Sequence, residues 1–197
     1  MRVLLVHSHP RPDSLSAALA RAVRDVLQAR GHAVEFRDLH AEGFDPVLGA
    51  AERGRYHDVP DNLAGLEDHA AALRRAEALV LVYPTWWYGM PAMLKGWFDR
   101  VWAPGLAFHL APPGSKAAIT PGLRNIRRVA VVTTYGSPWW LLLFLGHPDR
   151  RVIGRGIRRL CARGCRLDWH ALTRMDSRTR GECEAFLART REAFARW

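Results

Sequence analysis

The chain of 197 residues is predicted to be an α/β protein. We expect a doubly wound three-layer sandwich, with a sheet of about five parallel strands between two layers of helices. Two observations predict this class. Short runs of Val and Leu alternate with longer segments whose apolar residues recur at helical spacing. The first forty residues read as strand, loop, helix and strand, which is a right-handed crossover unit.

The elements of the first half follow in order. Residues 2–7 form a short apolar strand, and residues 15–30 place Leu, Ala and Val on one face of a helix. Residues 33–39 form a second strand. Residues 40–70 have no regular pattern, and helical spacing returns over residues 63–75.

The second half adds three strands and three helices. Its length and its hydrophobic content of 49% fit one domain with its own core, residues 1–197. No internal repeat and no linker interrupt it. The expected strands are residues 79–82, 127–133 and 165–172, and the expected helices are residues 91–101, 150–161 and 180–196.

Composition excludes several classes of protein. No apolar run reaches the ~20 residues that span a membrane, and the first apolar run is too short for a signal peptide. The three cysteines, at positions 161, 165 and 183, form no CxxC and no zinc spacing. We therefore expect a cytoplasmic protein with reduced thiols and without a bound metal.

The formal net charge is +10, and much of the excess is arginine between residues 124 and 166. No helix-turn-helix, zinc finger or RNA-binding motif accompanies this charge, so we expect no nucleic acid partner. The arginines are read as a solvated surface. The positive field still favours anionic ligands such as phosphorylated cofactors.

Three loops follow strands of the predicted sheet: residues 9–16, 84–91 and 133–140. The carboxyl ends of adjacent parallel strands meet in one crevice, so these loops are expected to converge. The first loop contains neither GxGxxG nor GxxxxGK[ST], which disfavours a nicotinamide Rossmann site and a nucleoside triphosphatase. Ser14 and Ser16 lie where the helix begins, where they suit either a phosphate or a simple N-cap.

The second loop contains three consecutive aromatic residues, Trp86, Trp87 and Tyr88. Exposed apolar surface costs about 25 cal/mol per Å², so this loop is expected to be covered. Two interpretations remain open from composition: the rings plug the loop onto its own helix or a subunit interface, or they form a shelf for a flat ligand. A flavin nucleotide, with a phosphate at one end and a flat ring at the other, fits the three loops together.

Two motifs then resemble a known family. His9-Pro10-x-Pro12-x-Ser14-Leu15-Ser16 and the stretch from Tyr83 to Val101, YPTWWYGMPAMLKGWFDRV, are similar to those of the NAD(P)H:quinone oxidoreductases. That family belongs to the flavodoxin-like superfamily, together with the potassium-efflux ancillary reductases. The resemblance covers the whole chain and implies a flavodoxin-like fold.

The resemblance also implies roles for individual residues. One group would hold the phosphate region of the flavin, a second would bound its isoalloxazine ring, and a third would line the pyrimidine side. In that order these are His9, Ser14, Leu15 and Ser16; Pro84, Thr85, Trp86, Trp87 and Tyr88; and Thr133, Thr134, Tyr135 and Gly136.

His147 lies where the family has the histidine that stabilises charge on the reduced flavin, and we assign it as the catalytic residue. A purely structural loop histidine is the alternative. The family's catalytic Tyr aligns with Leu141, and one substrate-capping Tyr becomes Phe108. We expect a substrate pocket formed by Trp87, Phe108, Trp140 and His147, more apolar than in the best-known members.

The implied activity is ping-pong hydride transfer from NAD(P)H through the flavin to a quinone or similar acceptor. FAD is the expected cofactor, with FMN as the alternative, and NADH and NADPH are not distinguished. We expect a homodimer, because Trp97, Trp102, Phe108, Trp139 and Trp140 would leave too much aromatic surface wet. Two other functions stay open: a flavodoxin-like electron carrier, and a flavin-binding regulatory subunit of a membrane ion-efflux system, whose transporter would be its link to a membrane.

Overall fold

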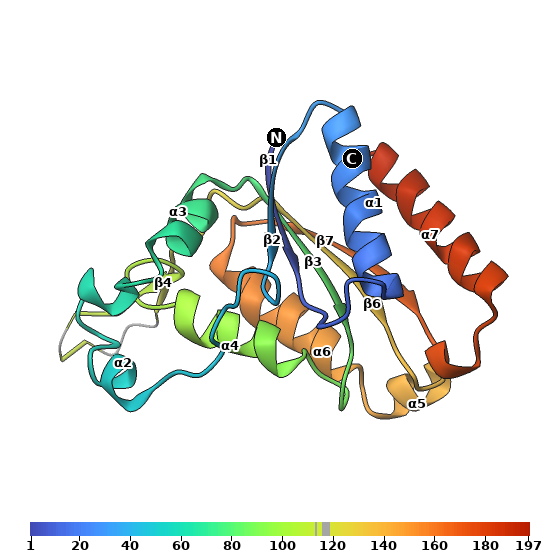
Figure 1. Cartoon of the computed structure of the whole chain (residues 1–197). Coiled ribbons are helices and arrows are strands. Elements are labelled where there is room, and N and C mark those ends of the chain that lie inside the picture. Colours follow the sequence, from blue (N-terminus) through green and yellow to red (C-terminus); the bar gives the residue numbers. More distant parts are fainter. Residues whose placement is uncertain (113, 116–118) are drawn as a thin grey trace.

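In the computed structural model, five parallel strands form the central sheet in the order β2-β1-β3-β6-β7 (Figure 1). The structure describes residues 1–112, 114–115 and 119–197. The strand order is that of a flavodoxin-like doubly wound sheet, so the expected fold class is confirmed. The strands are β1 (Arg2–His7), β2 (Ala33–Asp38), β3 (Ala78–Pro84), β6 (Arg128–Thr134) and β7 (Arg166–Leu172).

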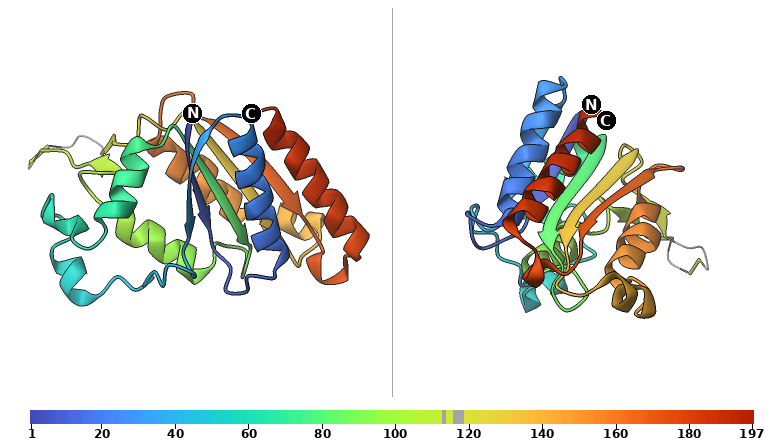
Figure 2. Two further views of the ribbon diagram at one scale, coloured as in Figure 1. Left: turned by 45° about the horizontal axis from the view of Figure 1, so that its top comes forward. Right: turned by 90° about the vertical axis from the view of Figure 1, so that its right-hand side faces the viewer.

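Helices α1 (Leu15–Ala29) and α7 (Arg180–Ala195) pack side by side on one face of the sheet (Figure 2). Side chains of a strand alternate between the two faces, so Val80 and Val82 of β3 point into this layer. Thr179 caps α7, because its side chain and that of Glu182 each accept from the other's backbone N–H.

The other face of the sheet is covered by α3 (Glu67–Arg75), α4 (Ala92–Val101) and the segment that begins with α6 (Pro148–Arg151). Leu79 and Leu81 of β3 point into this second core. β3 is an unbroken apolar run that is buried on both faces, because a layer of helices covers each side of the sheet. Figure 2 shows the resulting three layers. None of the described helices has both the length and the apolarity needed to cross a bilayer.

The segment predicted as one helix over residues 150–161 is helical but not regular. After α6 come a π-helical turn, η2 (Val152–Gly156), and a 3₁₀ helix, η3 (Ile157–Leu160). Gly154 and Gly156 lie in this segment, and glycine has a low helix propensity. The predicted helix is therefore present over nearly the expected range, but only its first turn is α-helical.

Residues 40–70 contain more structure than expected. A short helix, α2 (Ala50–Gly54), is held by Glu52, whose carboxylate accepts from Nε of Arg100 at 2.9 and 3.0 Å. A 3₁₀ turn, η1 (Asp61–Leu63), precedes α3, which begins four residues later than predicted. A small hairpin pairs β4 (Phe108–His109) with β5 (Thr120–Pro121) apart from the main sheet.

Two of the tryptophans expected at the surface lie in the core. Trp97 and Trp102 are buried and pack edge-on against each other, with ring centroids 6.2 Å apart. Trp97 lies on the buried side of α4 and Trp102 directly follows its last residue, and the sequence pattern did not separate them from exposed aromatics. Trp139 and Trp140 are exposed, as expected, on α5 (Trp139–Phe144), a short helix that was not predicted and whose first two residues were assigned to a loop.

Candidate active site

A hollow of about 680 Å³ opens at the carboxyl ends of β3 and β6. Pro84 and Thr134, the last residues of these two strands, form part of its wall. A third contribution comes from η4 (Met175–Ser177), which follows β7. The lining residues are Pro84, Thr85, Trp86, Trp87, Tyr88, Thr134, Tyr135, Gly136, Ser137, Met175 and Asp176.

The aromatic loop is a tight reverse turn. Trp86 and Gly89 exchange backbone hydrogen bonds of 3.1 and 3.0 Å, and the two residues between them have positive φ, 47° at Trp87 and 61° at Tyr88. Such backbone angles are uncommon for residues with large side chains and are found at functional sites. The turn leaves Trp87 96% exposed, so this ring does not plug the loop onto the protein.

Several backbone N–H groups around the hollow are available to a ligand. Within the described residues, the N–H groups of Trp87, Tyr88, Gly136 and Ser137 donate to no protein acceptor. Gly136 lies close to the far wall, since a Cβ there would lie 2.8 Å from Oδ2 of Asp176. The hollow therefore combines flat apolar rings with a set of free hydrogen-bond donors.

A cluster of polar side chains holds the loops that line the hollow. The hydroxyl groups of Thr85 and Thr133 are 2.8 Å apart, and Thr85 Oγ1 also donates to Oδ2 of Asp149 at 3.3 Å. The phenol of Tyr135 donates to the same carboxylate oxygen at 2.7 Å. These bonds tie the loops after β3 and β6 to α6.

Burial raises the pKa of Tyr135, and the neighbouring Asp149 carboxylate raises that pKa further. Burial likewise raises the pKa of Tyr83 well above its ordinary value. Both phenols therefore stay protonated, and Tyr135 can act as a permanent donor to Asp149. The cluster fixes the position of the loops through hydrogen bonds to the Asp149 carboxylate.

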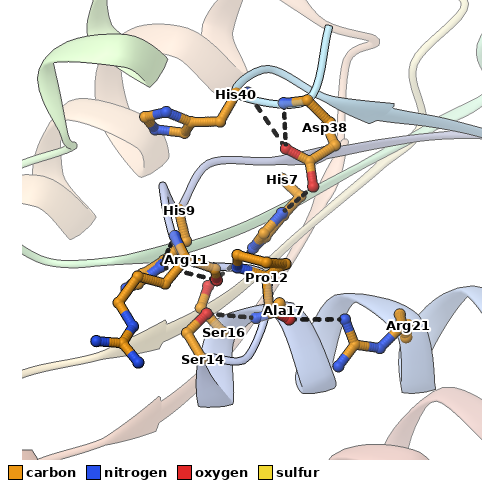
Figure 3. Close-up of polar contacts among 11 residues, drawn as sticks. His7, His9, Arg11, Pro12, Ser14, Ser16, Ala17, Arg21, Asp38 and His40 are labelled. Carbon is orange, nitrogen blue, oxygen red and sulfur yellow. Dashed lines mark hydrogen bonds and ion pairs between the residues drawn. The ribbon is translucent and has the colours of Figure 1, made fainter.

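The first loop lies at the amino end of α1 (Figure 3). Ser14 caps the helix, its Oγ accepting from the N–H of Ala17 at 3.1 Å, so the N-cap interpretation is correct. The first N–H groups of a helix have no partner within it, so those of Leu15 and Ser16 remain suited to an anion. The two interpretations of Ser14 are therefore compatible.

Two histidines shape this loop. His7 is buried, with Nδ1 3.0 Å from Oδ2 of Asp38 and Nε2 3.3 Å from the hydroxyl of Ser16 (Figure 3). Burial lowers the pKa of His7 below its ordinary value, although the bond to Asp38 opposes this. The His9 ring lies 6.1 Å from that of Trp86, which places the first loop beside the aromatic loop.

The structure brings most of the predicted flavin residues together. Eight of them line the hollow, and Thr133 and His9 lie directly beside lining residues. The sequence did not single out Ser137, Met175 or Asp176, although the rule for carboxyl ends of strands also applies to the loop after β7. Asp149 was also not predicted as a site residue. The one feature of the sequence that marks it is an acidic residue next to an Arg-rich segment.

Ser14, Leu15 and Ser16 of the predicted phosphate region do not line this hollow, and neither do three of the four residues predicted for the substrate pocket. Phe108 lies in the β4–β5 hairpin and packs against the core, and Trp140 lies half-exposed on α5. His147 lines a separate hollow with Arg150 and Arg151. Their roles as substrate-pocket and catalytic residues remain predictions.

The chain is similar to several curated oxidoreductases. It is 39% identical over 109 residues to an uncharacterised NAD(P)H oxidoreductase, YcaK of Escherichia coli strain K12, covering 54% of this chain and 55% of that protein. It is 30% identical over 168 residues to NAD(P)H dehydrogenase [quinone] 1 of Cavia porcellus, covering 77% of this chain and 60% of that protein. The chain thus spans little more than half the length of these relatives.

Two solved structures match almost the whole chain. Smu.1420 of Streptococcus mutans UA159 superposes with a TM-score of 0.87 at 28% identity, covering 100% of both chains. An NAD(P)H:quinone oxidoreductase from Methanothermobacter marburgensis superposes with a TM-score of 0.77 at 28% identity, covering 99% of this chain and 94% of the other. The Flavodoxin_2 family model, described as a flavodoxin-like fold, matches residues 1–140, and the chain therefore belongs to this family.

Proposed function

We propose that the protein is a flavin-dependent NAD(P)H oxidoreductase that passes two electrons to a quinone or a similar acceptor. The observation that carries the proposal is the exposed Trp87 ring beside four free backbone donors in one hollow. A flat ring with polar edges is the ligand that such a surface matches. The relatives named as NAD(P)H and quinone oxidoreductases support the same reaction class.

The residues present fit a flavin. The N–H groups of Leu15 and Ser16 at the start of α1 would hold a phosphate. Trp86, Trp87 and Tyr88 would cover the ring, and the N–H groups of Gly136 and Ser137 would donate to its polar edge. FAD is the proposed cofactor and FMN is the alternative.

When bound, the flavin supplies hydride chemistry, accepting from NAD(P)H and donating to the second substrate. The residues of the chain would hold the ring and stabilise its charge. Fixed backbone donors stabilise negative charge on a bound ring without reorganising, and Asp149 holds two of the loops that carry those donors. The exposed aromatic side chains would stack against the ring and keep water from it.

Reconstitution tests this proposal. Purified protein is mixed with FAD or with FMN, free flavin is removed, and absorption and mass identify the retained cofactor. We expect a yellow protein with about one flavin per chain, because the carboxyl ends of the strands form one crevice. A Trp87→Ala variant should retain less flavin, whereas a Trp197→Ala variant, changed at the chain end, should retain as much as the wild type.

A protein that stays colourless with both flavins would reject the proposal. Oxidation of NADH or NADPH by the flavin-loaded protein separates the enzyme from the electron-carrier alternative, since a carrier needs a separate reductase. Capture of a transporter from membranes, with no turnover of NAD(P)H, would instead favour the regulatory subunit.

A further inference from the structure

A second hollow, of about 370 Å³, lies along the segment that follows α5. Four arginines line this arginine hollow: Arg150, Arg151, Arg155 and Arg158. Among the residues that the structure describes, no carboxylate lines the hollow and none of the four arginines forms an ion pair. Some of the arginines read from the sequence as a solvated surface therefore converge on one hollow without a counter-charge.

Contacts with the rest of the chain position two of these side chains. The guanidinium of Arg150 lies over the ring of Trp169, with Cζ 5.9 Å from the ring centroid. Arg158 donates from Nε to the carbonyl of Gly154 and from Nη1 to the carbonyl of Cys165, both at 3.1 Å. These neutral partners hold the guanidinium groups and leave their charges uncompensated. An arginine that is already held in place loses less conformational freedom when it binds an anion.

The turn before α6 makes room for a third guanidinium, that of Arg151. A Cβ at Gly146 would lie 2.8 Å from Cζ and from Nη1 of Arg151, which is closer than such atoms pack. The φ of Gly146 is +74°, a backbone angle that glycine adopts without strain. A larger residue at position 146 would displace the Arg151 side chain, so the local sequence suits an arginine in this place.

The arginine hollow lies next to the main hollow, that of the candidate active site. The carboxylate of Asp149 accepts from Thr85 and Tyr135, and both of these residues line the main hollow. The residue that follows Asp149 is Arg150, which lines the arginine hollow. A molecule the size of a dinucleotide can therefore reach from one hollow to the other.

The phosphate of a flavin already has a proposed position at the start of α1, the helix that follows β1. In the sheet, β1 lies on one side of β3 and β6, and β7 lies on the other side. Leu167 of β7 lines the arginine hollow, so the main hollow lies between the two anion sites. The arginines are thus left for the second ligand of the main hollow, the nicotinamide dinucleotide.

We propose that the arginine hollow binds the 2′-phosphate of NADPH, so that the protein selects NADPH over NADH. The two dinucleotides differ only in this phosphate monoester, and arginine is the side chain that accommodates it in other dinucleotide sites. Guanidinium groups bind phosphate oxygens through charge-assisted hydrogen bonds, often two at a time. The inference rests on the function proposed above, because it assigns part of the co-substrate of that reaction.

Titration calorimetry of NADP⁺ and of NAD⁺ into the purified protein measures binding without turnover. We expect NADP⁺ to bind roughly tenfold more tightly or better, because hydrogen bonds to charged groups contribute that much. Inorganic phosphate should compete with NADP⁺ and reduce its advantage over NAD⁺. In an Arg151→Gln, Arg155→Gln variant, NADP⁺ should bind no more tightly than NAD⁺.

Steady-state kinetics of the flavin-loaded protein give a second readout. The same double variant should raise KM for NADPH roughly tenfold with kcat unchanged, and should leave both constants for NADH within about twofold, because the phosphate takes no part in the chemical step. An Arg191→Gln, Arg196→Gln variant removes two exposed arginines at α7, on the other face of the sheet, and should keep the preference for NADPH. Circular dichroism confirms that each variant is folded.

The inference fails if the wild type binds NADP⁺ and NAD⁺ equally, even where inorganic phosphate binds to the arginine hollow. It also fails if the Arg151→Gln, Arg155→Gln variant keeps the preference, or if the α7 variant loses it to the same extent. These results are distinct from a failure of the proposed function. A yellow protein that oxidises NADH and NADPH equally well rejects this inference alone, and a colourless protein that prefers NADP⁺ rejects the proposed function alone.

Discussion

The phenol of Tyr135 donates a hydrogen bond of 2.7 Å to Oδ2 of Asp149, and both residues are buried. Fourteen residues separate them in the chain, and α5 lies between. The same oxygen accepts from Thr85 at 3.3 Å, so one carboxylate joins the loops after two neighbouring strands. The hollow keeps its shape because these loops share this acceptor.

Removing that acceptor should destabilise the protein. In Asp149→Ala, the hydroxyl of Tyr135 is left buried without its acceptor, which costs about 1–3 kcal/mol of unfolding free energy. Asp149→Asn keeps an acceptor oxygen and should lose less. Denaturant unfolding of the flavin-free proteins measures both. An alanine variant within about 0.5 kcal/mol of the wild type would show that the cluster does not stabilise the fold.

A second prediction concerns Gly96 in α4. A Cβ at this position would lie 2.1 Å from the carbonyl oxygen of Pro46, so the helix and the chain around Pro46 approach too closely for any side chain. Gly96→Ala should therefore lower the unfolding free energy by about 1–3 kcal/mol or more, as overpacking does. Thermal and denaturant unfolding measure the loss.

Gly181 provides the matched control for Gly96. It is also helical, in α7, but nothing lies within 4 Å of a Cβ placed there. Gly181→Ala should be neutral or stabilising by up to about 1 kcal/mol, because alanine has the higher helix propensity. Equal effects of the two substitutions would mean that backbone entropy, rather than the contact with Pro46, decides the first result.

The third prediction concerns pH. Because burial lowers the pKa of His7 in the folded state, the unfolded chain binds a proton there first as pH falls below about 6.5. The free energy of unfolding should therefore decline from pH 6.5 down through the folded-state pKa. The pKa values of His9, His32, His69 and His170 are lowered too, also chiefly by burial, so they add to the decline.

His7→Gln should reduce the slope of the unfolding free energy against pH. The reduction is at most the contribution of one proton, about 1.4 kcal/mol per pH unit within the window. Glutamine keeps a polar group opposite Asp38 and Ser16. His57→Gln changes an exposed histidine and serves as the control. Unfolding curves at several pH values between 5 and 8 give the slopes, and a His7 variant as steep as the wild type would contradict the assignment.

The sheet could be predicted because each central strand is an apolar run, and β3 shows why. All seven of its residues are buried, so the local sequence alone carries the signal. The convergence of loops on one edge then followed from the rules for parallel strands. Nothing comparable marks Asp149, whose importance depends on partners 14 and 64 residues away.

The failures have physical reasons as well. Trp97 and Trp139 both lie among apolar residues in the sequence. Trp97 is nevertheless buried, whereas Trp139 is 63% exposed. The difference is set by which side of a helix faces the sheet, and α5 was not recognised as a helix. Likewise η2 departs from α-helical geometry in a segment that contains Gly154 and Gly156, and a Cβ at Gly154 would lie 3.1 Å from Cδ2 of Leu167.

A fourth prediction is a homodimer formed through α5. Trp139, Trp140, Leu143 and Phe144 are all exposed on this short helix, beside the hollow that contains Ser137. Exposed apolar patches of this kind mark interfaces. We expect sedimentation at micromolar concentration to give twice the chain mass, with the partner chain completing each hollow.

Phe144→Ser should shift this equilibrium towards the monomer, because Phe144 is 83% exposed in the single chain. Val47→Ser, an exposed apolar residue outside α5, should leave the dimer intact. A wild-type monomer with full activity would reject both the dimer and the shared pocket.

The last prediction concerns His147, whose backbone has a φ of 49° and a ψ of 66°. Asparagine tolerates these left-handed angles better than alanine, so His147→Asn removes the imidazole with the least backbone strain. If His147 stabilises charge on the reduced cofactor, this variant should bind flavin normally. Its flavin should be reduced by NAD(P)H about tenfold to a hundredfold more slowly, with kcat and kcat/KM falling together.

Stopped-flow reduction of the flavin-loaded fraction measures that rate, and thermal unfolding shows any structural role. His147 lines a hollow with Arg150 and Arg151, so loss of stability with an unchanged reduction rate would assign it to packing of that segment. Charge stabilisation would then fall to backbone donors of the main hollow. Tyr135 could not supply one, because its N–H already donates to the carbonyl of Leu172 at 2.8 Å. Gly136 and Ser137, whose N–H groups have no acceptor among the described residues, would take that role.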